Sequence, residues 1–181
     1  MEEITFPSEI PEQPEIQELK DYWYALSQAS EGDADHQASE GDADHKVPTL
    51  PPRSAINPGH LKKYLPDITI MELTEENDFH IRLFGTNLAS WMGPDRTGRT
   101  LVNITADIET TLELSKAQLR WLNIMNRVIA EKKPLVWTGL RFDITKKHHQ
   151  IRAISLPLTQ TTGDVEQIMT ALYLHVPPRS L

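Results

Sequence analysis

The sequence contains no cysteine among its 181 residues. This absence excludes disulfide bridges, thiolate zinc sites, iron–sulfur clusters, thiol nucleophiles and a cysteinyl flavin adduct. The chain also lacks any run of about eighteen consecutive apolar residues, and the segment after Met1 has neither the basic nor the apolar region of a secretory signal. We therefore predict a cytoplasmic protein that has no membrane as a partner.

Basic residues are scarce near the N-terminus. Residues 1–45 hold 13 acidic residues and one basic residue, a charge of −12, whereas residues 46–181 hold 13 acidic and 17 basic residues, a charge of +4. The asymmetry indicates an interaction tail or a solvated tail, and it argues against nucleic acid as a partner. We accordingly divide the chain into an acidic arm, residues 1–46, and a domain, residues 47–181.

The acidic arm has three predicted parts. Residues 1–13 contain two prolines and four acids, so we expect them to be extended and poorly ordered. From Glu15 to Ala29, apolar residues recur at helical spacing and predict an amphipathic helix that needs a partner surface. Residues 28–36 are repeated without change in residues 37–45, which is typical of a spacer loop.

The predicted helix carries four residues as a candidate interaction surface. They are Leu19, Tyr22, Trp23 and Leu26. Two surfaces are open to them: the sheet of the same chain, or the same helix of a second copy in a homodimer.

The order of the remaining elements predicts the fold class. Strands are expected over residues 68–73, 79–84, 135–144, 150–158 and 165–176. Short helices are expected near residues 57–64 and 87–92, and a long helix over residues 107–133 connects the second strand to the third. This order excludes a doubly wound parallel sheet. The simplest product is an α+β fold with one five-stranded antiparallel sheet and helices on one face, preceded by the amphipathic helix and acidic loop.

Several motifs are distinctive within residues 21–176. They are Tyr22-Trp23, Pro52-Arg53 with Asn57-Pro58, Leu65-Pro66-Asp67, the run from Phe79 to Thr86, and Gly93-Pro94-Asp95 with Thr97-Gly98-Arg99. Together they resemble the single-domain PAS proteins of alphaproteobacteria. The last two motifs are moderately specific in combination. The resemblance implies a PAS-like fold and a signalling role, either through docking onto proteins such as histidine kinases or regulators, or through a small ligand held between sheet and helices.

No set of residues suggests catalysis or a metal site. His80 and His175 fall in predicted strands and His148-His149 in a basic turn, without acids at metal-ligand spacing. The long predicted helix has no histidine, which disfavours the haem that some PAS sensors bind. We therefore predict a non-catalytic protein without a metal, and we leave its cofactor undefined.

Five residues are candidates for ligand binding. Trp91, Trp121 and Trp137 would line a pocket for a non-covalent flavin or another aromatic ligand, although tryptophans at such spacing are more often plain core. Arg96 and Arg99 flank a glycine loop and would meet an anionic ligand or an acidic partner surface; the alternative is a structural loop whose arginine pairs with a neighbouring acid.

Overall fold

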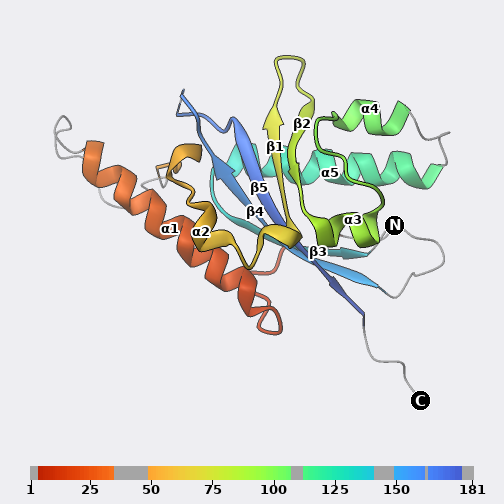
Figure 1. The fold of residues 1–181 in the computed structure, drawn as a ribbon, viewed down its shortest axis with the longest axis horizontal. Coiled ribbons are helices and arrows are strands. Elements are labelled where there is room, and N and C mark those ends of the chain that lie inside the picture. The colour runs from red at the N-terminus through yellow and green to blue at the C-terminus, as the bar shows by residue number, and fades with distance from the viewer. Residues whose placement is uncertain (1–3, 35–48, 107–111, 141–148, 162, 177–181) are drawn as a thin grey trace.

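A computed structural model describes residues 4–34, 49–106, 112–140, 149–161 and 163–176 of the chain (Figure 1). The helices are α1 (Pro14–Ala34), α2 (Pro58–Leu61), α3 (Thr86–Met92), α4 (Leu101–Ala106) and α5 (Leu112–Glu131), with two 3₁₀ turns, η1 (Arg53–Ala55) and η2 (Leu65–Asp67). The strands are β1 (Ile68–Leu73), β2 (Phe79–Phe84), β3 (Leu135–Leu140), β4 (Gln150–Leu158) and β5 (Gln167–His175). Within the described residues, no helix is both long and apolar enough to cross a bilayer.

The five strands form one antiparallel sheet in the order β2-β1-β5-β4-β3. The predicted fold class is therefore confirmed, and three strands have the bounds that alternation predicted. The helix α4 was not predicted. The duplicated spacer, the last part of the third predicted strand and the start of the long predicted helix lie outside the described residues.

Side-chain alternation separates the two faces of the sheet. On one face, the buried Trp137 of β3 packs against Trp121 of α5 and donates to Ser155 of β4. On the other face, Arg152 and Tyr173 are paired neighbours that lie near acids of the α1 side. Figure 1 shows the same arrangement, with α1 in front of the sheet and α5 behind it. The long helix α5 thus covers one face of the sheet, as predicted, and α1 covers the opposite face.

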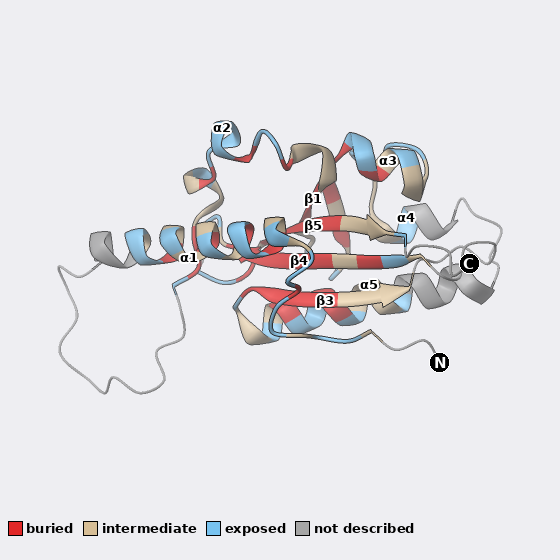
Figure 2. Ribbon diagram, turned by 90° about the horizontal axis from the view of Figure 1, so that it is seen from below, coloured by how far each residue is buried: buried red, intermediate tan, exposed pale blue. Residues whose placement is uncertain are grey.

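The helix α1 is attached to the sheet through its apolar stripe. Ile16, Leu19 and Trp23 are buried, and the indole N–H of Trp23 donates to the carbonyl of Pro157 at 2.7 Å. Pro157 lies beyond Ser155, the last residue of β4 that β3 pairs with. Its missing N–H therefore breaks no bond to β3, and its carbonyl is available to the indole. Figure 2 shows buried residues along β4 and a mixture of buried and exposed residues along α1.

Both outer edges of the sheet are covered by irregular segments. Beside β2, Gly98 donates to the carbonyl of Ile81 and Ile81 donates to that of Arg99, each at 2.8 Å. Beside β3, Thr5 exchanges two backbone hydrogen bonds with Thr138, and Ile10 further along is buried. The prediction of poor order was therefore wrong for residues 4–13, because an unpaired sheet edge offers hydrogen bonds to a neighbouring segment.

Gly85, within the run from Phe79 to Thr86, has a steric role. A Cβ atom placed there would lie 2.2 Å from the carbonyl oxygen of Pro66. Backbone atoms cannot rotate away as a flexible side chain can, so a larger residue would force η2 away from the start of α3. This glycine therefore permits close packing between these two turns.

We predict that Trp23→Phe lowers the free energy of unfolding by about 2 kcal/mol, because the buried carbonyl of Pro157 loses its donor and a smaller ring leaves space. Urea unfolding of the full chain measures the change. Leu119→Ala is the control: Leu119 is 60% exposed, so its loss should cost less than about 0.5 kcal/mol. Equal stability of Trp23→Phe and the unmodified protein would contradict the assigned role.

Candidate functional site

The predicted aromatic residues Trp121 and Trp137 lie together on the α5 side of the sheet. Their ring centroids are 5.8 Å apart with planes at 80°, an edge-to-face pair. The indole of Trp137 donates to the Ser155 hydroxyl at 3.1 Å, which lies 3.0 Å from that of Thr170. A hollow beside the pair has a volume of about 10 Å³, on the order of the space one water molecule needs. In this state the two rings fill space between α5 and the sheet.

The other predicted ligand residues lie near the opposite edge. Trp91 belongs to α3, which follows β2 directly, and Arg96 and Arg99 belong to the loop that covers β2. Since β2 and β3 are the two outer strands of the sheet, the five residues form two separate groups. One group thus lies by each outer strand.

The loop over β2 requires glycine at two positions. Gly93 has φ of 110° and Gly98 has φ of 84°, values that side-chain-bearing residues rarely adopt. Within the loop, the side chain of Asp95 accepts from the backbone and hydroxyl of Thr97 at 2.9 and 2.7 Å. These contacts hold the loop in shape between the two glycines.

Arg96 is the most unusual charge in this loop. Its partly buried guanidinium donates to the carbonyl of Met92 at 3.1 Å, and none of the described carboxylates forms an ion pair with it. Burial lowers the pKa of Arg96, and the nearby charge of Arg99 lowers it further. Arg99 itself donates to the carbonyl of Asn103 at 2.9 Å. Arg96 therefore has donors to spare for an anion.

The structure places the four predicted interaction residues of α1 against their own chain. Leu19 and Trp23 are buried, while Tyr22 and Leu26 are partly buried. The Tyr22 hydroxyl accepts from the backbone N–H of Asn57 at 3.1 Å. Of the two partner surfaces predicted for this helix, the same chain's sheet is the one in contact here. Outward-facing residues of α1 include Gln17, Glu18, Asp21 and Ala25.

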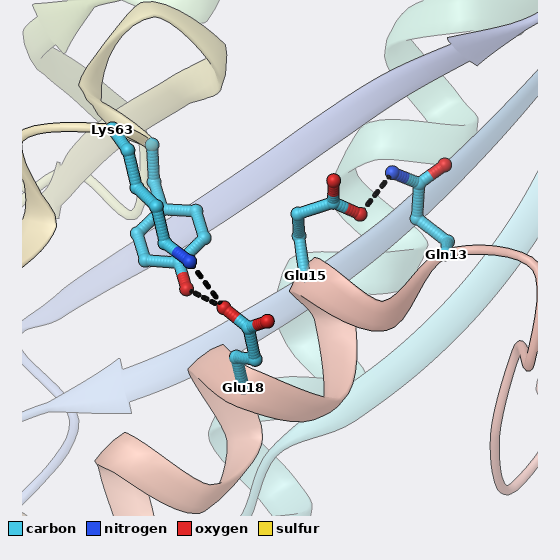
Figure 3. Close-up of polar contacts among 5 residues, drawn as sticks. Gln13, Glu15, Glu18 and Lys63 are labelled. Carbon is cyan, nitrogen blue, oxygen red and sulfur yellow. Dashed lines mark hydrogen bonds and ion pairs between the residues drawn. The ribbon is translucent and has the colours of Figure 1, made fainter.

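A group of acids and phenols at the start of α1 was missed by sequence reasoning. We name Glu15, Glu18, Tyr64, Asp67 and Tyr173 the carboxylate–tyrosine cluster. Figure 3 shows Glu18 pointing toward Lys63, with 2.5 Å between Oε2 and Nζ. The hydroxyl of Tyr64 donates to the same oxygen. The members come from three segments far apart in the chain, so no local spacing could have identified them.

The pKa values of two acids in this cluster are shifted in opposite directions. Hydrogen bonds from Lys63 and Tyr64 lower the pKa of Glu18. Burial raises the pKa of Asp67, and the charge of Glu15 raises it further, despite a hydrogen bond from Asn87. The Tyr173 hydroxyl is buried and has no hydrogen-bond partner among the described residues, and burial followed by the charge of Asp67 raises its pKa. The described residues include no group of His, Asp and Glu side chains arranged to hold a metal.

We predict opposite pH effects for two substitutions in the cluster. Glu18 binds protons less tightly in the folded state, so its contribution is present above its ordinary pKa of 4.5 and is lost as pH falls through its lowered value. Glu18→Gln should therefore lower the melting temperature more at pH 7 than at pH 3. Asp67 has a raised folded pKa, so its ionisation disfavours folding as pH rises above 3.8.

Asp67→Asn should accordingly raise the melting temperature at pH 7 and leave it unchanged in acid. Thermal unfolding of both variants and the unmodified chain between pH 3 and pH 7 provides the comparison, and each variant serves as the other's control. Shifts of the same sign at pH 7 would refute the assignment.

Comparison with known proteins gives one family. A family model described as "PAS domain" matches residues 12–173. No curated protein matches the chain. A solved structure titled "Structure of an RNA-binding Light-Oxygen-Voltage Receptor" is 16% identical with a TM-score of 0.40, over 76% of this chain and 36% of that one.

The chain thus spans about a third of that receptor's length, and a likeness at this TM-score transfers no function. The family match is more extensive. It runs from just before α1 into β5, and it includes the first four strands and most of the fifth. The chain therefore belongs to the PAS domain family, whose members are sensory and signalling modules.

Proposed function

We propose that this PAS domain acts without catalysis, by binding other signalling proteins such as histidine kinases or regulators. The supporting observation is the outer face of α1. Trp23 fastens this helix to β4 at 2.7 Å, and Ser27 donates to the carbonyl of Thr49 at 2.7 Å. A helix held at two points along its length presents its outward residues in a defined arrangement.

The charge of this face favours a basic partner surface. Glu18 and Asp21 are exposed on α1, and the sequence around them belongs to the segment with a charge of −12 over residues 1–45. Complementary charge increases the rate and selectivity of association. Two copies of an acidic face repel each other, so this face suits a different protein better than a second copy.

We predict that Asp21→Lys weakens binding of the native partner by about fivefold or more, since a rim charge is reversed. Asp21 accepts a hydrogen bond from Gln17 at 2.7 Å on the exposed surface, so the fold should be unaffected. The partner is first identified by affinity capture from the native host, and binding of the purified proteins is then measured at two salt concentrations.

Glu76→Lys is the matched control, because Glu76 is an exposed acid in the turn between β1 and β2. The two variants have the same net charge but place it at different sites. Equal weakening by both would show a general charge effect, and no weakening by Asp21→Lys would remove α1 from the interaction.

A second candidate function is small-ligand sensing, and Arg96 favours it. A partly buried guanidinium that donates a hydrogen bond to the carbonyl of Met92 and has a like-charged neighbour is suited to bind a carboxylate or phosphate group. Such a ligand would lie by the loop over β2. The aromatic pair lies by β3, at the other edge of the sheet.

For this function, native mass spectrometry of the freshly purified full chain should show an anionic adduct that Arg96→Gln loses. An absorbance scan of the same sample tests for a coloured cofactor. Arg82→Gln is the control, because Arg82 lies on the neighbouring strand β2 and already pairs with Glu72. A colourless protein at its apo mass, with no gain in melting temperature from phosphate or citrate, would exclude this function in favour of protein binding.

A further inference from the structure

The segment from Ile4 to Phe6, which we name the strap, lies along the outer edge of β3. The N–H of Thr5 donates to the carbonyl of Thr138 at 3.0 Å, and the N–H of Thr138 donates to the carbonyl of Thr5 at 2.9 Å. The hydroxyls of the same two residues are 2.7 Å apart. The strap is therefore paired in antiparallel fashion with β3, although only one residue pair is formed.

The side chains of the strap alternate as in a strand. Ile4 lines the hollow next to Trp121 and Trp137 on the α5 side. Phe6 lies on the same side, with its ring 4.0 Å from the guanidinium carbon of Arg127 of α5. Thr5 points to the other face, where its hydroxyl meets that of Thr138. The site thus has backbone groups along one strand and places for two apolar side chains beside α5.

The strap uses only part of this edge. In an antiparallel strand, backbone groups that point outward recur at every second residue, so Val136 presents its edge as Thr138 does. Continuing the register places residue 7 opposite Val136, and residue 7 is a proline. Proline has no N–H to donate. No backbone hydrogen bond joins Pro7 to Val136 within the described part of the chain.

The strap is only partly buried. Thr5 is exposed and Phe6 is 37% exposed, so water already reaches part of the segment that a competing strand would displace. A longer strand without the proline would form the same contacts and would also bind Val136. Such a strand would form more hydrogen bonds with β3 than the strap does. The strap's advantage is that it is tethered, which gives it a high effective concentration at the site.

We propose that the outer edge of β3 is a strand-docking site which the strap occupies in cis, and that an extended segment of a partner protein displaces it. The segment carries a branched apolar residue, a threonine or similar β-branched residue, and an aromatic residue, followed by a residue that has an N–H. Main-chain pairing supplies affinity and the two apolar positions supply selectivity, as in other forms of strand addition. This inference rests on the proposed function only in that the partner is a protein.

The test uses the full chain with its strap opened. Thr5→Pro removes the N–H that donates to Thr138, whereas Thr5→Val, the control, keeps it and removes only the hydroxyl. Three fluorescent peptides are titrated by anisotropy: residues 2–9 as they stand, the same peptide with Pro7→Thr, and the same peptide with Thr5→Pro. Circular dichroism establishes that each protein variant is folded.

The Thr5→Pro protein should bind the Pro7→Thr peptide most tightly, the unchanged peptide more weakly, and the Thr5→Pro peptide not at all. The unmodified protein and Thr5→Val should bind the Pro7→Thr peptide roughly tenfold more weakly than Thr5→Pro does, because the tethered strap competes. Hydrogen exchange at Thr138 should be faster in Thr5→Pro and should slow when the peptide is bound.

A folded Thr5→Pro protein that binds none of the peptides would overturn the proposal. So would a Thr5→Pro protein that forms dimers by light scattering and ignores the peptides, since the edge would then serve a second copy of the chain. If Thr5→Pro does not fold, Phe6→Ala weakens the strap through an exposed side chain, and the same order of peptide affinities is expected. Either negative result leaves the test at Asp21 unaffected, so the two hypotheses fail separately.

Discussion

The hydrogen bond between the indole of Trp23 and the carbonyl of Pro157 is the contact on which the α1 side of the molecule depends. It joins two residues 134 positions apart in the chain. Their positions in the backbone allow the contact to form. Pro157 follows the last pairing of β4 with β3, and Trp23 is at the centre of the buried stripe of α1. Because a buried carbonyl needs a donor, this contact determines where α1 lies on the sheet and which of its residues face outward.

The position of α1 also creates the unusual electrostatics beside it. Once the helix lies against β4, Glu15 and Glu18 come close to Tyr64, Asp67 and Tyr173. One cation, Lys63, bonds to Glu18, while Asp67 is held by an uncharged amide. The same packing that stabilises the core therefore concentrates negative charge on this side, and the exposed part of that charge is what would attract a basic protein surface.

The two outer strands of the sheet differ in how they are covered, and this difference separates two functions. The loop over β2 is held by two backbone bonds to Ile81 and by its own turn, and it contains Arg96 without an acidic partner among the described residues. The strap over β3 makes two backbone bonds to one residue, and a proline follows it. We therefore propose the first edge for a small anion and the second for an exchangeable strand.

Local patterns in the sequence were sufficient for the order of the strands and for the resemblance to the PAS family, because alternation with period two and helical spacing depend on neighbours in the chain. Strands β1, β2 and β4 and the apolar stripe of α1 follow from such patterns. Local patterns did not predict three other features. These are the strap, the carboxylate–tyrosine cluster and the separation of the five predicted ligand residues into two groups. Each depends on which strands become neighbours in the sheet, and contacts such as Thr5 with Thr138, 133 residues apart, form only when tertiary packing brings those segments together.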